Sequence, residues 1–459
     1  MSHFSEIPLP PTWATAPIEK VAEINPGLKK SGIDDRLAVA FVPMPAVEAE
    51  SGRMDVSATR PFGEVKKGYT AFCEGDILFA KITPCMENGK MAVVPALRNG
   101  LGFGSTEFHV LRPRKGISAQ YLYYFVSAQQ FRRDAEHNMT GAVGQRRVPM
   151  PYLAQHSIPI PPEPEQRRIV AKIEELFSEL DKGVENLTIA RKQLKAYRQA
   201  ILKAAFEGKL CNASIAQGNS WTARPLGGLI EFLTSGSRGW ADYYSKHGDI
   251  FIRAQNLKHD RLDLTDIAYV RLPQGNTEGV RTRVRQGDVL ITITGANVTK
   301  TGLVDTELGP AYVSQHVALC RLTDDLQPEF LYWYLLSEAG GRRQLNEAAY
   351  GAGKPGLSLE NIRNVVVPVP SVCDQKLVVS EIKRLIEGQQ QTDAEIEVEL
   401  ARAEALRQSI LKRAFSGLLV AQDSEDEPAS VLLERIRAEH DEGRTTKRRN
   451  NKNGKKEAA

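Results

Sequence analysis

The chain has 459 residues, more than one ordinary domain holds, so two or more domains are expected. Its 42% hydrophobic and 25% charged residues are ordinary for a soluble globular protein. No charge-free run of 18 apolar residues occurs, which excludes a transmembrane helix, and the first residues lack the features of a signal peptide. Five scattered cysteines without a C-x-x-C pair indicate reduced thiols and a cytoplasmic location. The eight histidines are dispersed, so no metal site is predicted, and a net charge of +4 alone says little about nucleic acid.

Residues 1–157 are predicted to form a mixed globular part. Apolar, β-rich runs lie at 76–82, opened by a Gly-Asp turn, and at 109–113. Residues 119–137 have the pattern of an amphipathic helix with an aromatic inner face, and Leu153 belongs to a short helix before a proline segment. These elements predict a compact α+β domain.

Residues 158–210 predict one long helix. Prolines precede it and Gly208 follows it, as is typical of helix ends. From Glu165 to Glu207 it would run roughly 65 Å at about 1.5 Å per residue. Apolar or small residues recur at steps of four and three, the heptad seam of a helix that packs on another helix. They are Ile169, Ile173, Leu176, Leu180, Leu187, Ala190, Leu194, Tyr197, Ile201 and Ala204, with Phe206 near the end.

Residues 211–366 predict a second globular part of the same kind. Runs at 289–294, again opened by a Gly-Asp turn, and at 317–322 are predicted strands. Residues 328–347 predict an amphipathic helix, and Ile362 a short one. The second part therefore repeats the element order of the first.

Residues 367–420 repeat the long helix 209 positions after the first, without a gap. The seam is retained at both ends, by Val378, Ile382, Leu385, Ile396, Ala403, Leu406 and Ile410, with Phe415 near the end. Its middle is polar, with Gln389 and Thr392 on the seam, which indicates a surface facing a partner or water, or a break in the helix. The natural partner of each helix is the other copy, so the two predict an intramolecular spacer.

Residues 421–459 differ from the rest. An acidic turn precedes one short amphipathic helix at 429–443. The last residues are polar and basic and are expected to be disordered, with an auxiliary DNA or subunit contact as the alternative.

The repeat extends beyond the helices. Trp13-x-x-x-Pro17-Ile18 matches Trp221-x-x-x-Pro225-Leu226, and 140–161 matches 349–370. The chain is therefore two copies of one unit, each a variable globular part followed by a long helix.

Catalytic motifs are weak throughout. The tetrapeptide of amino-methyltransferases is missing, Gly102-Phe103-Gly104 is isolated, and the stretch 295–301 lacks the second glycine of a phosphate loop. Asp55, Glu64 and Lys66 have the spacing of a nuclease carboxylate set. Among 56 carboxylates such a match arises easily by chance, and a solvated surface is the alternative.

Features typical of nucleic-acid binding are more coherent. Glycine loops with long polar or basic side chains occur at 140–147 and 351–354, the same place in both units, where backbone amides and cations can approach phosphates. A tight turn is the alternative. Arg281, Arg283 and Arg285 alternate along a predicted strand, which equally suits a charged edge strand. Other stretches carry side chains of the types that read base edges. The candidate DNA-binding residues are Lys81, Thr83, Lys90, Gln145, Arg146, Arg147, Arg238, Arg253, Gln255, Asn256, Lys258, Arg281, Arg283 and Lys354.

Over essentially its whole length the chain resembles the specificity subunits of type I restriction–modification systems. The features that match are the two-unit architecture, the W-x-x-x-P-[IL] openings, and the glycine loop leading to PIPPEPEQRRIVAKI. The helix ends RQAILKAAFEGKL and RQSILKRAFSGLL complete the set.

The resemblance implies two target-recognition domains, each reading one half of an asymmetric site in double-stranded DNA. It implies that the two long helices form an antiparallel coiled coil that spaces the half-sites and docks two methyltransferase subunits. Catalysis would belong to partners, with S-adenosylmethionine on the methyltransferase and ATP on a motor–nuclease subunit. Two alternatives stay open: a coiled-coil scaffold without DNA readout, and an enzyme with an unrecognised nuclease site.

Overall fold

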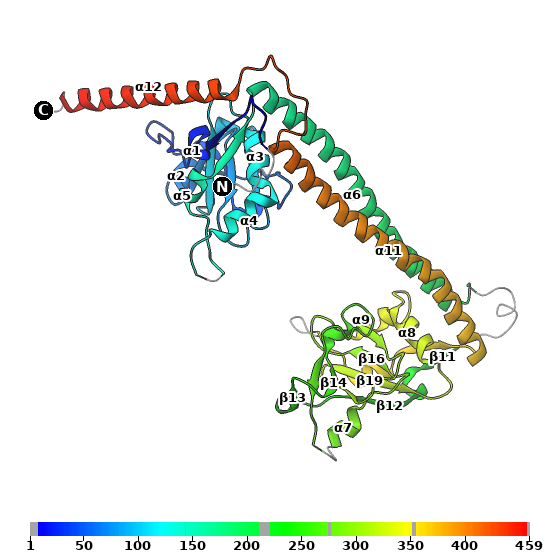
Figure 1. Cartoon of the computed structure of the whole chain (residues 1–459). Helices are drawn as coiled ribbons and strands as arrows, with labels where there is room; N and C mark the ends of the chain where they lie inside the picture. Colours follow the sequence, from blue (N-terminus) through cyan, green and yellow to red (C-terminus); the bar gives the residue numbers. More distant parts are fainter. Residues whose placement is uncertain (1–7, 143, 211–220, 274–276, 351–354, 457–459) are drawn as a thin grey trace. The chain divides into compact units, whose positions relative to one another are not determined.

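The computed structural model describes residues 8–142, 144–210, 221–273, 277–350 and 355–456, excepting the side chains of 390 and 443–456. The chain divides into two units, 1–185 with 399–459, and 186–398. Each unit holds one globular domain and one half of each long helix, α6 (Glu163–Phe206) and α11 (Val372–Phe415) (Figure 1). The α+β repeat predicted from the sequence is therefore confirmed.

The first globular domain is built on two four-stranded sheets and a two-stranded ribbon. The sheet orders are β2-β9-β6-β7, all antiparallel, and β4-β3-β8-β5, in which β3 and β8 are parallel. The ribbon pairs β1 with β10. The strands are β1 (Ala14–Pro17), β2 (Ala22–Ile24), β3 (Ala38–Val42), β4 (Thr59–Pro61), β5 (Thr70–Cys73), β6 (Ile77–Ala80), β7 (Met91–Val93), β8 (Leu101–Gly104), β9 (Phe108–Pro113) and β10 (Ser157–Ile160). The helices are α1 (Ile18–Val21), α2 (Phe62–Val65), α3 (Ala119–Ser127), α4 (Gln129–His137), α5 (Met150–Gln155) and α12 (Ala429–Lys456), with one-turn 3-10 helices η1 (Met44–Ala46) and η2 (Arg98–Gly100).

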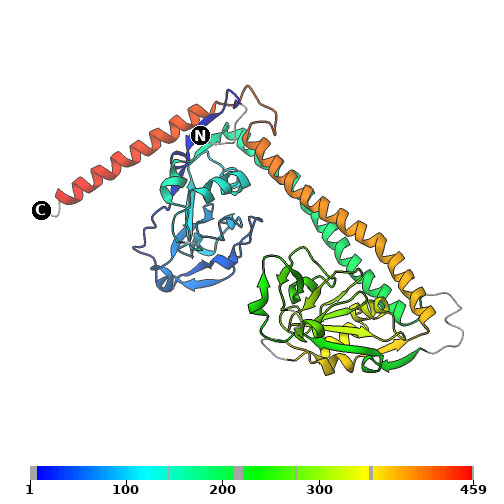
Figure 2. The same ribbon diagram turned by 60° about the horizontal axis from the view of Figure 1, so that its bottom comes forward.

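The second globular domain repeats this plan with one altered sheet. Its sheets are β12-β19-β16-β17 and β13-β15-β14-β18, with β14 and β18 parallel, and its ribbon pairs β11 with β20. Figure 2 draws this domain in green and yellow. The strands are β11 (Thr222–Pro225), β12 (Ile230–Ser235), β13 (Tyr244–Ser245), β14 (Asp249–Ile252), β15 (Ala268–Val270), β16 (Val289–Thr292), β17 (Thr301–Leu303), β18 (Ala311–Val313), β19 (Val317–Leu322) and β20 (Val366–Val369). The helices are α7 (Thr277–Thr282), α8 (Pro328–Leu336), α9 (Gly341–Ala348) and α10 (Leu359–Arg363), with 3-10 helices η3 (Leu226–Leu229), η4 (Trp240–Tyr243) and η5 (Ala254–Leu257).

The Gly-Asp turns that open β6 and β16 act in the same way in both domains. Asp76 accepts the backbone N–H of Cys73 and binds Arg112 through both carboxylate oxygens, at 2.7 Å each. Asp288 accepts the N–H of Arg285 and binds Arg321 in the same bidentate geometry, at 2.8 Å each. The aspartate of each turn thus ties the start of β6 or β16 to the neighbouring strand, β9 or β19.

The single helices predicted at 119–137 and 328–347 are wrong, because each is interrupted. The first breaks at Ala128, whose ψ of 138° is extended, and the second at 337–340. At each break the side chain of a glutamine from a long helix accepts a backbone N–H: Gln408 from Gln129, at 3.0 Å, and Gln199 from Glu338, at 2.9 Å. The sequence pattern predicts the apolar face of each helix but gives no sign that a glutamine side chain from a distant helix binds at the break.

The two long helices lie antiparallel within each unit. In unit 1, Arg407 of α11 binds Asp181 and lies 4.4 Å from the ring centre of Phe177. In unit 2, Arg191 of α6 binds Asp393 at 3.1 Å and Glu397. Helix α11 runs unbroken past Gln389, so the break that its polar middle suggested does not occur.

The last turn of each long helix completes a globular core. Phe415 is fully buried in the first domain and makes edge contacts with Tyr121 and Phe125. Phe206 makes the equivalent contacts in the second domain, with Phe330 and Tyr334. Each domain is therefore held by the helix that follows it and by the end of the other one.

The start of each helix is held by a repeated glutamine. Gln166 accepts the N–H of Ser118 at 2.8 Å and donates to the carbonyls of Gly116 and Pro161. Gln375 makes the same three bonds with Gln327, Asp325 and Pro370. This network explains why the glutamine recurs in both copies.

The predicted boundaries at 157 and 366 need correction. Residues 158–160 and 367–369 are strands, not helix, and pair with β1 and β11. The helices begin later, at Glu163 and Val372, because the preceding prolines favour extended backbone. The proline segments therefore belong to the globular domains.

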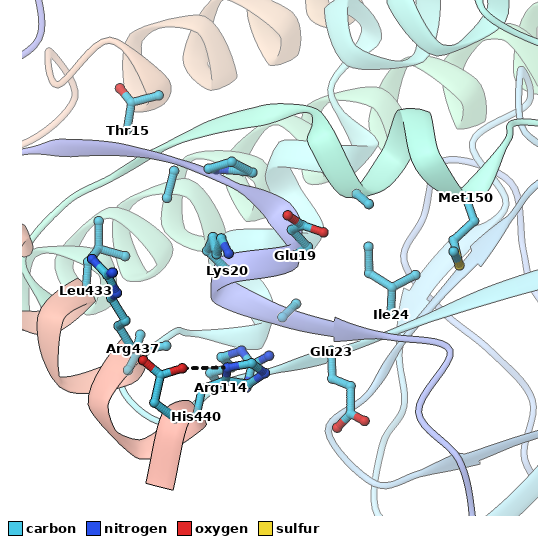
Figure 3. A pocket seen from close by; sticks show the side chains of 16 residues that line it. Thr15, Glu19, Lys20, Glu23, Ile24, Arg114, Met150, Leu433, Arg437 and His440 are labelled. Atoms are coloured by element: carbon cyan, nitrogen blue, oxygen red, sulfur yellow. Dashed lines mark ion pairs between the residues drawn. The ribbon is translucent and has the colours of Figure 1, made fainter. Parts of the chain in front are cut away.

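Helix α12 extends further than predicted. It runs from Ala429 to Lys456 rather than ending near 443, so disorder after 443 is wrong. Ala429, Leu432 and Ile436 are buried against the first domain, and residues of both α1 and α12 line a cavity of about 790 Å³ (Figure 3). The stretch past Glu442 is rich in arginine and lysine, which have good helix propensity and favour the C-terminal end of a helix dipole.

Replacing Phe415 with alanine tests the contribution of the helix end. We expect a loss of about 3–5 kcal/mol in the first domain, because a fully buried phenylalanine leaves a cavity in its core. Urea unfolding of the full chain, followed by circular dichroism, measures the shift of that domain's transition. Leu406→Ala on the same helix is the control, since Leu406 is 45% exposed. Equal losses in the two variants would contradict a core role for Phe415.

Candidate nucleic-acid interface

In the first domain the glycine loop docks beside the loop that follows β6. We call residues 81–89 the central loop of this domain. The N–H of Val148 donates to the Lys81 carbonyl at 2.8 Å, and both the N–H and the hydroxyl of Thr83 donate to the Arg146 carbonyl at 3.0 Å. Five candidates, Lys81, Thr83, Gln145, Arg146 and Arg147, therefore come together from two distant stretches.

The second domain uses the same backbone bonds. Its central loop, residues 293–299, follows β16. The N–H of Leu357 donates to the Ile293 carbonyl at 2.8 Å, and the N–H of Gly295 donates to the Pro355 carbonyl at 3.2 Å. Residues 355–357 of the second domain are thus equivalent in the structure to residues 146–148 of the first, whereas the second glycine loop itself, with Lys354, lies outside the described residues.

The two arginines of the first glycine loop have different surroundings. Arg147 binds Glu107 through two nitrogens, at 2.9 and 2.8 Å, and this hydrogen bonding lowers the pKa of Glu107. Arg146 lies 3.6 Å from Glu136 and 3.9 Å from Glu87, longer than hydrogen bonds. Arg147 therefore anchors the loop, and Arg146 is the cation better placed to turn toward a phosphate or a base.

His109 fixes the base of this loop. Its Nε2 donates to the Val148 carbonyl at 3.0 Å, and its Nδ1 accepts from Asn25 at 3.1 Å. Burial lowers the pKa of His109, which keeps the ring neutral, as these two bonds require.

Lys90 is placed differently from the other candidates of the first domain. Its ammonium donates to the carbonyls of Val47 at 2.9 Å and Met44 at 3.3 Å. These bonds hold the segment around η1, so the structure gives Lys90 a structural task.

Of four neighbouring candidates in the second domain, three are held by internal bonds. Asn256 is buried, accepts the N–H of Arg253 at 2.9 Å and donates to two carbonyls. Arg253 and Gln255 both bind Asp266. Lys258 is exposed. Asn256 therefore shapes η5, while the other three lie nearer the surface.

The alternating arginine strand predicted at 281–285 is wrong. Arg281 lies in α7, binds Glu278 at 2.7 Å and donates to the Ser235 carbonyl. Arg283 is exposed and forms a single bridge with Tyr312. The i,i+3 pair of Glu278 with Arg281 along one face favours this helix. Arg238, in the loop adjoining α7, is exposed.

Sequence reasoning missed one residue in each domain that contacts these loops. Glu107 binds Arg147, and the residue 209 positions later, His316, contacts the Thr294 hydroxyl. In both domains this residue's carbonyl accepts the first N–H of the central loop, from Lys81 or Ile293, at 2.9 Å. The constant offset was the available signal, but the change from glutamate to histidine concealed it.

The predicted helix residues mostly lie between the two helices or in the domain cores. Ile173, Ile201, Ile382, Ile396 and Phe415 are buried, and Leu180, Leu187, Leu194, Phe206 and Ile410 are half-buried. Tyr197 and Leu406 were assigned to the seam wrongly, since they are 53% and 45% exposed. Ile189 and Val398 are exposed as well, at 45% and 64%.

The weak catalytic motifs gain no support. Lys66 pairs with Asp35 at 2.7 Å, and Asp55 accepts the N–H of Ser57. Gly102 and Gly104 lie within β8, and the turn at Gly295 is part of the central loop. Within the described ranges, no three His, Cys, Asp or Glu side chains gather as metal ligands, and no helix is long and apolar enough to cross a membrane.

Comparison with known families explains this arrangement. The type I restriction modification DNA specificity domain matches residues 10–188 and 219–402, which is both globular domains with parts of both helices. The chain belongs to this family. Its two globular domains are DNA specificity domains, and the scaffold alternative gains no support.

Curated relatives agree. The EcoKI specificity subunit of Escherichia coli K12 is 26% identical over 94% of this chain and 96% of its own length. The EcoAI specificity subunit of Escherichia coli is 40% identical over 174 residues, 38% of this chain and only 29% of that protein. The higher identity is thus confined to part of each protein.

Solved structures share the fold. One, from work on complex assembly and conformational transition of the type I restriction–modification system, has a TM-score of 0.72 at 21% identity and covers 90% of this chain and 100% of its own. The HsdS subunit from Thermoanaerobacter tengcongensis has a TM-score of 0.51 at 21% identity, covering 90% and 99%.

His109 makes a pH dependence testable. Because its pKa is lowered in the fold, the unfolded chain binds the proton more readily. The stabilisation is present above the unfolded pKa of about 6.5 and is lost as the pH falls through the lower folded pKa. We expect urea midpoints to fall from about pH 7 to about pH 5, and to fall less in His109→Gln.

His137→Gln is the matched control, because His137 is exposed on α4. Burial also lowers the pKa of His156, so part of the dependence remains in His109→Gln. The same pH slope in wild type and His109→Gln would contradict the role of His109.

Proposed function

We propose that this chain reads a bipartite, asymmetric site in double-stranded DNA, one half with each globular domain. It directs adenine methylation or restriction by partner subunits and carries out no chemistry itself. S-adenosylmethionine is bound by methyltransferase subunits and ATP by motor–nuclease subunits, in the cytoplasm.

One observation carries this proposal. The backbone around Arg146 and Arg147 in the first domain and around the equivalent residues Pro355 and Gly356 in the second makes the same hydrogen bonds, yet the side chains at these positions differ. Phosphate contacts position a protein on DNA, whereas side chains at base edges specify the sequence. One framework with two sets of side chains suits two different half-sites.

The exposed residues of the long helices support two docked copies of one partner. Ile189 and Tyr197 on α6 recur 209 positions later as Val398 and Leu406 on α11, and all four are exposed. Positions i and i+8 belong to one apolar stripe of a helix. Repeated exposed stripes favour two methyltransferase subunits, one on each.

A domain exchange tests the reading role. Residues 1–162 are replaced by the corresponding domain of another family member, while α6 and α11 are retained so that Phe415 and Gln408 still complete the core. The chain is co-expressed with the methyltransferase subunit, and methylation is mapped at base resolution. We expect one half of the motif to change and the other half to stay the same. Exchange of residues 219–371 is the mirror control; an unchanged motif after either exchange would rule out readout by that domain.

Charge on one stripe tests the docking. In Ile189→Glu with Tyr197→Glu we expect the complex to hold one methyltransferase copy instead of two, because a carboxylate is costly in an apolar contact. Native mass spectrometry counts the copies. Val280→Glu, at a residue 78% exposed in the second domain, is the control. Two copies bound to the double variant would refute this docking surface.

A further inference from the structure

Each globular domain buries one arginine beside its central loop. Arg132 of α4 is 8% exposed and Arg342 of α9 is 7% exposed. In both, Nε donates to a carbonyl at the end of the preceding helix, Ser127 or Leu335, at 3.1 Å. The two guanidinium groups are therefore set in the same way on their helices.

The remaining nitrogens of each arginine span two segments. Arg132 donates Nη2 to Glu50 at 2.8 Å and Nη1 to the Glu87 carbonyl at 2.6 Å. Arg342 donates Nη2 to Asp260 and Nη1 to the Thr299 hydroxyl, the latter at 3.4 Å. Glu87 and Thr299 both lie near the C-terminal end of their central loops, so each arginine holds its loop at that end.

The carboxylate partners also share an unusual backbone. Glu50 has a φ of 57° and Asp260 a φ of 56°, left-handed values that non-glycine residues adopt only when their surroundings hold them there. Glu50, Lys90 and Arg132 each recur 210 positions later, as Asp260, Lys300 and Arg342. This group of an acid, a lysine and a buried arginine, which we call the arginine node, is therefore present in both copies, although the sheets around Glu50 and Asp260 differ in strand order.

The lysine supports the same segment in both domains. Lys300 donates to Asp260 at 2.8 Å, whereas Lys90 donates to the Val47 carbonyl, three residues before Glu50. Burial raises the pKa of Asp260, but Arg342 and Lys300 outweigh it and lower the pKa. The acid is thus an ionised anchor for the arginine.

We propose that Arg132 and Arg342 are positioning residues for sequence readout, each fixing the central loop of its own domain against the glycine loop. This inference rests on the proposed function. Base discrimination depends on side chains held in one geometry, so a loosened central loop lets the adjoining Lys81, Thr83 and Arg146 accept wrong bases. Each arginine therefore governs one half-site.

A contribution to folding stability alone does not explain why both domains contain the arginine node. A buried ion pair is often replaceable by apolar side chains of similar volume without loss of stability. Glu50, moreover, is 55% exposed, so it contributes little as a core residue. What both domains have in common is a loop that must be held from both ends.

The experiment uses the full chain co-expressed with its methyltransferase subunits, with methylation mapped at base resolution. In Arg132→Lys we expect the preference for the correct site over single mismatches to fall about tenfold in one half only. Arg342→Lys should relax the other half. Glu50→Gln, a mild change at an exposed partner, should relax the same half as Arg132→Lys and keeps the test valid if the lysine variant is insoluble.

Arg112→Lys is the matched control. It weakens another ion pair of the first domain, with Asp76, which has no bond to the central loop. We expect it to lower the thermal midpoint without changing base preference. Relaxation of both halves by Arg132→Lys, the same relaxation in Arg112→Lys, or unchanged preference in Arg132→Lys and Glu50→Gln would overturn the inference alone. A wild-type chain that directs no bipartite methylation would overturn the proposed function and the inference with it.

Discussion

The structure depends on the exchange of helix ends between two copies of one unit. The first domain is closed by Phe415 and Gln408 from the end of α11, and the second by Phe206 and Gln199 from the end of α6. Neither core is complete with its own following helix alone. The pairing of the helices is therefore a condition of domain stability and not only a means of linking two domains.

This exchange explains which residues the two copies retain. Glutamines at both ends of each helix use their amide groups on backbone donors and acceptors, and a buried backbone group left without a partner is costly. A substitution at Gln166 or Gln408 leaves such backbone groups without a hydrogen-bond partner, whatever DNA the domain reads. In the second four-stranded sheet of each domain, which lacks the equivalent of these glutamine contacts among the described residues, the strand order differs between the copies.

Repeats and periodicity were sufficient to predict the α+β domains, the long helices and the strands after the Gly-Asp turns. Three features were beyond them. The helix breaks near Ala128 and Ser337 depend on a glutamine from a distant helix. Tyr197 is exposed although it fits the heptad pattern, since that pattern alone does not show which of its positions face outward. Arg281 is helical because a local pair with Glu278 outweighs the alternation of its neighbours. Of the candidate site, the glycine loops were predicted, whereas Lys90 and Asn256 were chosen by residue type, and residue type does not show what a side chain binds inside the fold.

The arrangement separates what must stay constant from what must vary. The backbone bonds that join the central loops to residues 146–148 and 355–357 are the same in both domains, and so are the buried arginines beside the central loops. The side chains at equivalent positions of this framework differ, as with Arg146 in the first domain and Pro355 in the second. A new half-site then requires new side chains at a few positions and no new fold. The framework therefore has to be rigid. If a loop that contacts the bases shifts by a fraction of a hydrogen-bond length, it loses the geometry that distinguishes one base pair from another. The three nitrogens of a buried guanidinium donate in one plane and hold a helix end, a neighbouring acid and the loop together, whereas a lysine in its place lacks that fixed planar fork.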